Sequence, residues 1–313
     1  MVKVESGLFN RLSGTLEKSR TTFQTRKTGI VAEKKPIPPK DARGRRECVR
    51  WIYRYLCDKW NTLSEQEKQQ YDETAEKHNI TLFNAYLKEE LTPRLWKCKL
   101  AKMDGQVLYL AMVEGEGNVA KDFSGYNNNA TLVNVQWATG RYGHAIKFTG
   151  DGTYAYVTDK PKLNPDYITI FAWVRLTAPL SEQGTYASVV YKYYTATTPY
   201  KGFYLEMRSS DNRTIFAIRD QNNNMRAVYF QDLPADMNWH FVAGTYDGNK
   251  QTLYLDELST SITWTGTISK STTTLLIGAN DLKAEIALVG ILNKGLTSEE
   301  IAKIYELTKP YFE

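Results

Sequence analysis

The acidic residues of the chain do not form the pattern that glycoside hydrolysis needs. Two carboxylates must lie a few ångströms apart, and alternating acids on one strand would supply them because alternate side chains share a face. The predicted strand at residues 203–207 carries one acid, Glu206. Asp247 and Asp256 fall in or near predicted turns. We therefore expect no catalytic carboxylate pair and predict a protein that is not an enzyme.

Histidines and cysteines are few and widely spaced. The three histidines are His78, His144 and His240, so a nucleophile would have no evident base. The three cysteines are Cys48, Cys57 and Cys98. They show no CxxC or other zinc-ligand spacing, and all of them precede the region with β character. We expect free thiols in a helical region rather than a disulfide or a zinc site.

Aromatic and amide side chains in predicted loops or on outer faces are the candidate ligand-binding residues. Tyrosine is abundant, with 21 residues. Aromatic rings stack on the C–H faces of sugars, and Asn side chains offer both donors and acceptors. The candidates for glycan binding are Tyr193, Tyr194, Tyr200, Asn222, Asn223, Asn224 and Trp264. Ordinary loop composition is the alternative explanation for the same residues.

Positive charge is concentrated at the start of the chain. The formal net charge is +5, yet residues 1–50 hold 13 Lys and Arg against 5 Asp and Glu. Basic segments of this kind contact nucleic acid, acidic protein surfaces or anionic membranes. The candidate anchoring residues are Lys34, Lys35, Lys40, Arg43, Arg45, Arg46 and Arg50. We favour docking onto a neighbouring protein subunit over nucleic-acid binding, with an unoccupied solvated tail as the further alternative.

The elements that would carry these residues divide the chain into four parts. They are an extended basic arm (1–44), a small helical domain (45–103), a β-domain (104–307) and a C-terminal tail (308–313). The arm holds two β-prone runs suited to a hairpin and a Pro-rich link at residues 34–40. In the helical domain, apolar residues recur at helical spacing, and Ser64 with Glu67 predicts a capping box. The β-domain alternates short apolar runs with turn residues, which is typical of an all-β sandwich or barrel.

Several motifs follow one another in a fixed order through the β-domain. They are DFSGYNNNATL at 122–132, GRYGHAIKF at 140–148, ITIFAWV at 168–174, WHFVAGTYDG at 239–248 and LTSEEI at 296–301. Together they resemble the concanavalin A-like family in its laminin-G-like form. The resemblance implies a mainly β fold, an antiparallel β-sandwich jelly roll. Here it would be joined to the small α-helical domain and the extended basic arm.

Members of this family often bind Ca²⁺ near their Asp-x-Ser-Gly loop, and the resemblance therefore implies a calcium site here. Its ligands would be oxygens of Asp122, Ser124, Asn127 and Asn128. The acids that the family usually carries on its last strand are replaced by Ala287 and Leu288. Because calcium needs several oxygen ligands, we favour the alternative, a turn whose Asp and Asn side chains bond their own backbone.

A second, separate resemblance concerns the N-terminal region. A Gly-containing start, a short basic hairpin, a Pro-rich link and a helical WNTLSEQEKQQY segment at residues 60–71 follow one another there. This arrangement resembles small phage and prophage virion-associated proteins. No apolar run approaches the length of about 18 residues that a membrane span needs, and the start shows no signal-peptide core. We therefore expect synthesis in a host cytoplasm and a final place in the virion.

Together these features predict a non-enzymatic virion structural protein, as a capsid-associated decoration, turret, fibre or tail component. The arm and helices would anchor it to other virion proteins and to copies of itself as a homo-oligomer. The jelly roll would decorate the surface or bind a host-surface glycan, since the fold alone does not decide between these roles. A cellular carbohydrate-binding or adhesion protein is the alternative, and a glycoside hydrolase of the same fold is the third hypothesis.

Overall fold

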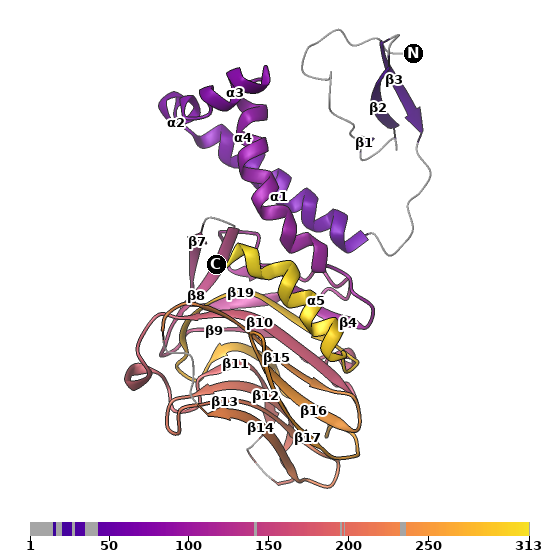
Figure 1. Ribbon diagram of the computed structural model, residues 1–313, viewed down its shortest axis with the longest axis vertical. Coiled ribbons are helices and arrows are strands. Elements are labelled where there is room, and N and C mark those ends of the chain that lie inside the picture. The colour runs from indigo at the N-terminus through magenta and orange to yellow at the C-terminus, as the bar shows by residue number, and fades with distance from the viewer. Residues whose placement is uncertain are drawn as a thin grey trace.

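Three regions make up the chain. The computed structural model describes residues 15–16, 21–26, 29–34, 43–140, 143–194, 196, 198–231 and 236–312. Within them lie a short N-terminal β-sheet, a helical region and a large β-sandwich (Figure 1). The sandwich confirms the predicted mainly β fold with antiparallel sheets. None of the described helices is both long and apolar enough to cross a membrane.

The N-terminal strands form an antiparallel sheet of their own. The strands are β1 (Thr15–Leu16), β2 (Thr21–Arg26) and β3 (Gly29–Lys34), in the order β1-β2-β3. Thr, Ile and Val in β2 and β3 favour extended backbone. Arg26 pairs with Gly29, so β2 and β3 form a hairpin. Among the candidate anchoring residues, Lys34 ends β3, whereas Lys35 and Lys40 lie outside the described residues.

Helices follow this sheet in the chain. They are α1 (Arg43–Thr62), α2 (Glu65–Gln69), α3 (Asp72–His78), α4 (Leu82–Leu91) and the 3-10 helix η3 (Thr92–Leu100). The capping box forms at the start of α2, where the side chains of Ser64 and Glu67 each accept a hydrogen bond from the backbone N–H of the other residue. α1 buries Cys48, Ile52 and Leu56, which recur every four residues on one face.

A disulfide between Cys48 and Cys98 ties α1 to η3, with a Cα–Cα distance of 5.5 Å. The prediction of free thiols was therefore wrong for these two residues. They lie 50 residues apart in the sequence, and α1 packs directly on η3. The pairing comes from this packing of two distant helices, which no local spacing reveals. Cys57 is a free thiol, as expected.

Two eight-stranded antiparallel sheets make up the sandwich. The first, the covered sheet, runs in the order β17 (Leu258–Thr263), β16 (Lys250–Leu255), β15 (Trp239–Tyr246), β10 (Ile168–Leu176), β19 (Lys283–Leu292), β8 (Gly143–Thr149) and β7 (Gln136–Gly140), with β4 (Gln106–Leu110) also paired to β19. The second, the open sheet, runs in the order β14 (Met225–Gln231), β13 (Arg213–Arg219), β12 (Lys201–Arg208), β11 (Ser188–Tyr194), β18 (Leu275–Ala279), β9 (Tyr154–Val157), β6 (Ala130–Val133) and β5 (Val119–Ala120). Many neighbouring strands are distant in sequence, as a jelly roll requires.

The central strand β10 shows how the layers are built. Successive side chains of a strand point to opposite faces. Ile170, Ala172 and Val174 lie in the apolar core between the two sheets. Phe171 and Trp173 point the other way, yet they are buried as well, in a second apolar cluster with the helices. The continuous apolar run of β10 therefore reflects a strand that is buried on both faces.

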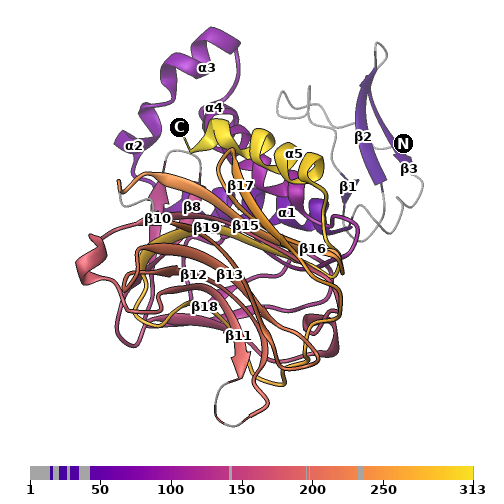
Figure 2. The same cartoon turned by 60° about the horizontal axis from the view of Figure 1, so that its bottom comes forward.

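The outer face of the covered sheet is closed by η3 and by the C-terminal helices α5 (Ser298–Thr308) and η6 (Lys309–Tyr311). The Trp173 ring stacks on Phe312 with a centroid distance of 4.2 Å. Its indole N–H donates a hydrogen bond to Thr308 Oγ1 at 2.8 Å. Figures 1 and 2 show α5 lying across this sheet, on the side away from the open sheet.

A buried lysine holds η3 on the sandwich. Lys97 is 1% exposed, and its ammonium group donates to backbone carbonyl oxygens of three separate segments. The distances are 2.5 Å to His144, 2.9 Å to Ala287 and 3.3 Å to Met112. Burial lowers the pKa of Lys97 to about 7, because the charged form loses its hydration.

The disulfide leads to a stability prediction. We expect the double variant Cys48→Ser/Cys98→Ser to lose about 4 kcal/mol of unfolding free energy, because the bond closes a loop of roughly 50 residues in the unfolded chain. Urea unfolding under non-reducing conditions measures this loss. Cys57→Ser is the matched control, with an expected change of less than about 0.5 kcal/mol. Equal stability of the double variant and the parent, or three titratable thiols in the native protein, would contradict the disulfide.

Candidate functional site

The outer face of the open sheet carries a row of aromatic side chains. Residues directly opposite each other on neighbouring strands share a face of the sheet. Tyr204 of β12 lies opposite Tyr191 of β11, Tyr191 lies opposite Leu276 of β18, and Leu276 lies opposite Tyr156 of β9. The register of four strands thus assembles an aromatic surface from positions spread over more than a hundred residues of sequence.

At one part of this surface four rings form the tyrosine cluster, which consists of Tyr191, Tyr193, Tyr200 and Tyr204. Tyr193 meets Tyr204 edge to face, with centroids 5.2 Å apart, and lies 6.4 Å from Tyr200. Tyr191 and Tyr204 are stacked at 6.3 Å. Aromatic pairs at such separations hold one another in place, so the cluster is a preorganised surface.

Beside the cluster lies a hollow of about 580 Å³, here called the tyrosine hollow. Its lining includes Tyr186, Tyr191, Tyr193, Tyr204, Glu206 and Arg208. The volume falls in the range of ordinary small-molecule sites, and the lining combines aromatic rings with a few polar groups, as such sites do. Arg208 lies over the Tyr186 ring, with 5.2 Å between the guanidinium carbon and the ring centroid.

Glu206 is the buried acid of the hollow, with 3% exposure. Its carboxylate accepts from Arg208 Nη2 at 3.3 Å and from Ser188 Oγ at 3.4 Å. Burial raises the pKa of Glu206 to about 7, and the attraction of Arg208 only partly opposes this rise. The group therefore exchanges a proton near neutral pH. Asp281 is a second acid that lines the hollow.

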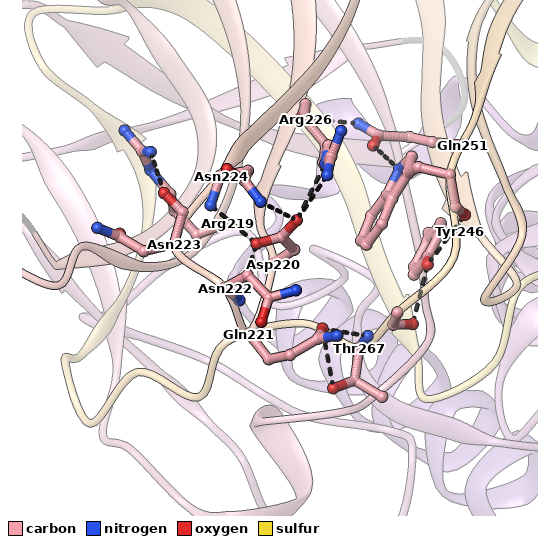
Figure 3. Close-up of polar contacts among 12 residues, drawn as sticks. Arg219, Asp220, Gln221, Asn222, Asn223, Asn224, Arg226, Tyr246, Gln251 and Thr267 are labelled. Atoms are coloured by element: carbon pink, nitrogen blue, oxygen red, sulfur yellow. Dashed lines mark hydrogen bonds and ion pairs between the residues drawn. The ribbon is translucent and has the colours of Figure 1, made fainter.

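The β13–β14 turn borders the tyrosine cluster, and Asp220 organises it. The Asp220 carboxylate accepts backbone N–H groups of Asn222 at 2.9 Å and Asn224 at 2.8 Å, and it binds Arg226 at 3.0 Å (Figure 3). Burial would raise the pKa of Asp220, but these hydrogen bonds hold it below its usual value. Asn223, at the tip, adopts the left-handed conformation with φ 65°, which Asn tolerates better than most residues. The prediction that these Asn residues lie in a loop is confirmed.

Arg219 joins this turn to the tyrosine cluster. Its Nε donates to the Tyr193 hydroxyl at 2.5 Å, and its Nη1 donates to the Asn223 carbonyl oxygen at 2.8 Å. The guanidinium carbon lies 5.1 Å from the centroid of the Tyr200 ring. The structure therefore brings the candidate residues Tyr193, Tyr200 and Asn223 together around one arginine.

Trp264 and Tyr194 stand apart from this group. Trp264 is 7% exposed, stacks on Tyr246 with centroids 4.0 Å apart and donates to Gln251 Oε1 at 2.8 Å. Trp264 does lie in a loop, directly after β17, but its ring is buried and not open to a ligand, because a hydrogen-bond acceptor inside the sandwich allows the indole to be buried. Tyr194 is half-buried at the end of β11.

The candidate calcium residues surround Asp122, which is 4% exposed. Its carboxylate accepts N–H groups of Tyr109, Ser124 and Asn128 at 2.8–2.9 Å and the Ser124 hydroxyl at 2.7 Å. Asn128 Nδ2 donates to the Val107 carbonyl oxygen, and Asn127 is left-handed, with φ 61°. These contacts are those of the turn that we favoured, and calcium binding stays a prediction. No group of three or more His, Cys, Asp or Glu that could hold a metal occurs within the described ranges.

The candidate anchoring residues that the structure describes on α1 lie along its first two turns. Arg43 begins the helix, and Arg45 donates to the Lys99 carbonyl oxygen at 2.8 Å. Arg46 is half-buried, and Arg50 is exposed. Anchoring through these residues also stays a prediction.

Sequence reasoning missed several residues of the site, namely Tyr186, Tyr191, Tyr204, Arg208 and Arg219. A usable signal was the alternation in two strands, because Tyr191 and Tyr193 must share one face, as must Tyr204, Glu206 and Arg208. Which face remains exposed depends on the helices, and so the alternation alone could not identify a site.

The sequence of the sandwich matches the model of a known protein family. Residues 149–302 match the family model of the concanavalin A-like lectin/glucanases superfamily. No curated relative matches the chain in sequence.

Solved structures with the same fold are binding domains of clostridial toxins. The binding domain of paraclostridial mosquitocidal protein 1 has a TM-score of 0.53 at 16% identity, over 64% of this chain and 52% of that chain. A structure of botulinum neurotoxin type C has a TM-score of 0.52 at 18% identity, over 65% and 51%. The botulinum neurotoxin DC binding domain in complex with SialylT has a TM-score of 0.53 at 19% identity, over 65% and 51%. The matches thus span about half the length of those structures and show the shared fold.

The raised pKa of Glu206 leads to a pH-dependent stability prediction. The folded protein binds this proton up to a pH of about 7, whereas the unfolded chain releases it near 4.5, so Glu206 lowers the stability progressively as the pH rises between these values. We expect the parent to lose about 2–3 kcal/mol more than Glu206→Gln between pH 5 and pH 8. Urea unfolding at both pH values measures the difference. Glu116→Gln, at an exposed carboxyl, is the control, and identical pH slopes for the parent and Glu206→Gln would refute the buried-acid argument.

Proposed function

Because the sandwich is of the concanavalin A-like lectin/glucanase type, we propose that this protein binds glycans through the outer face of its open sheet. The observation that carries the proposal is the tyrosine hollow with its adjoining tyrosine cluster. Rings of this kind stack on the C–H faces of a sugar, and the polar groups between them can bond its hydroxyls.

The charged and amide groups of the site suit such a ligand. Glu206 and Arg208 offer an acceptor and donors on one wall of the hollow, and Asn222 is exposed in the turn on the other side of the cluster. Sugar hydroxyls both donate and accept, so a surface with both kinds of group can satisfy them. The rings of the tyrosine cluster lie between Glu206 and Arg208 on one side and Asn222 on the other, and they provide the apolar contact.

The choice of sheet follows from the layers of the molecule. Helices cover much of the outer face of the covered sheet and leave there a hollow of about 290 Å³, lined by Arg175, Trp239 and Glu285 among others. On the outer face of the open sheet Tyr191 stays partly exposed, and Tyr186, in the turn before β11, is 55% exposed. Exposed aromatic patches rimmed by polar residues mark interaction sites.

The toxin domains of the same fold support a binding role. Cell entry of botulinum neurotoxin type C is described as dependent upon interaction with two ganglioside molecules, and the structure of the DC binding domain is that of a complex with SialylT. For the present chain, we infer that binding, without turnover, is the function. Cleavage of the bound glycan is the second candidate, and it is favoured only by the presence of the titratable Glu206 in the hollow.

A glycan array tests the binding role. We expect specific glycan binding by the full chain and at least a 10-fold weaker affinity for Tyr191→Ala, since stacking on one ring contributes roughly 1–2 kcal/mol. Tyr126→Ala removes an exposed tyrosine far from the hollow in sequence and is the matched control. Loss of binding in the control but not in Tyr191→Ala would place the site elsewhere. Release of reducing sugar that Glu206→Gln abolishes would assign hydrolysis instead.

We also propose that the N-terminal region attaches the sandwich to a larger particle, as a structural component of a virion. The basic surplus of residues 1–50 and the separate sheet β1-β2-β3 support an attachment role. The edge of a sheet can pair with a strand of a partner.

Light scattering tests the attachment role. We expect the full chain to self-associate and a variant lacking residues 1–42 to be a monomer, because the sheet β1-β2-β3, the element proposed to pair with a partner, lies in the deleted segment. A shortened chain that keeps η3 and the disulfide is the suitable comparison, since these elements cover the sandwich. The same number of chains per particle for both proteins would remove the support for this role.

A further inference from the structure

Arg219 is a cation whose partners are all uncharged. Within the described residues it contacts the Tyr193 hydroxyl, the Asn223 carbonyl oxygen and the faces of Tyr193 and Tyr200. None of these groups carries a negative charge that would neutralise the guanidinium. A half-buried cation without a counter-ion attracts an anion.

The acids nearest in the chain and in the site are already neutralised by other residues. The Asp220 carboxylate, adjacent in sequence, binds Arg226 at 3.0 Å and three N–H groups of the turn. Glu206, in the tyrosine hollow, binds Arg208 at 3.3 Å. Figure 3 shows the Asp220 carboxylate facing Arg226 and Asn224, while the Arg219 guanidinium lies beside Asn223. The positive charge of Arg219 therefore remains available to a ligand.

The geometry leaves part of the guanidinium free to bind. Its Nε and Nη1 make the two hydrogen bonds to Tyr193 and Asn223, and its Nη2 has no partner among the described residues. The tethers fix the plane of the group, so its remaining N–H donors are preorganised. Asn223 Oδ1 is a buried acceptor that also has no hydrogen-bond partner within the described chain. Both observations indicate a place where a ligand group completes the hydrogen bonding.

We propose that the glycan bound here is acidic, and that Arg219 selects it by pairing with the carboxylate of a sugar acid. This inference rests on the proposed glycan-binding function of the same site. A planar guanidinium matches a carboxylate with two parallel N–H donors, and such charge-assisted pairs are stronger than neutral hydrogen bonds. The Tyr200 ring under the guanidinium would contact the sugar ring that carries the carboxylate. Asn223 Oδ1 would accept from one of its hydroxyls.

Matched pairs of acidic and neutral glycans test this assignment by isothermal titration. The pairs are oligogalacturonate with its methyl ester, and sialyllactose with lactose, so that each pair differs mainly in the charged group. We expect the full chain to bind at least one acidic member about 10- to 100-fold more tightly than its neutral partner, the usual effect of a charge-assisted pair. Rising salt concentration weakens the acidic complex alone.

Variants at Arg219 separate charge from geometry. We expect Arg219→Gln to lose this preference, so that the ratio of the acidic to the neutral affinity falls to about 1 whatever the neutral affinity becomes. Arg219→Lys keeps the charge but not the paired donors, so it should retain an intermediate preference. Arg213→Gln is the matched control, because Arg213 lies on the same face of β13 but pairs with Asp211 at 3.3 Å. Thermal unfolding of each variant checks that the fold is intact.

The outcomes test the acidic preference of Arg219 and the glycan-binding function separately. An acidic preference that Arg219→Gln abolishes and Arg213→Gln leaves unchanged supports the inference. Equal affinity for acidic and neutral partners, or an acidic preference that survives Arg219→Gln, overturns it while the glycan-binding function stands. Failure to bind any member of the array overturns both.

Discussion

Helices pack against the outer face of the covered sheet, and this packing leaves the open sheet as the main candidate for a binding surface. Trp173 projects outward from the middle of the covered sheet, and it is buried only because Phe312 and Thr308 lie over it. Lys97 holds η3 on the same face through three backbone carbonyl oxygens. An ammonium group without hydration needs such acceptors, and so η3 has little freedom to leave. The outer face of the open sheet carries the tyrosine hollow instead.

The open sheet shows how a binding face is kept rigid without a covering layer. Its tyrosines pack on one another: Tyr193 and Tyr204 are buried, and they hold Tyr191 and Tyr200, which stay partly exposed, in place. Asp220 and Arg226 neutralise each other within the turn beside them. Arg219 is anchored by neutral groups instead, and its charge remains uncompensated. Arg226 is neutralised by Asp220, whereas Arg219 bonds only uncharged groups among the described residues. The positive charge beside the tyrosine cluster is therefore that of Arg219.

Local patterns were sufficient for much of the fold. Alternation and turn residues indicated the strands, the ordered motifs indicated the jelly roll, and the box of Ser64 and Glu67 formed as expected. The exceptions arose where distant elements meet. Cys48 and Cys98 pair across 50 residues, and Trp264, which follows β17, is buried with its ring stacked on Tyr246 of β15. Neither contact has a short-range signature, because both partners are brought together only by packing.

The sequence by itself determined the fold class, the loop position of Asn222, Asn223 and Asn224 and the basic character of the N-terminal region. These features depend on side-chain periodicity, turn chemistry and charge, which are local properties of a chain. Only the tertiary structure decided which sheet is covered, that Tyr191 faces Tyr204, and that Arg219 pairs with no acid among the residues that the structure describes. Register between strands and the stacking of layers are set by contacts between segments far apart in the sequence, and a surface made from several strands exists only once those contacts have formed.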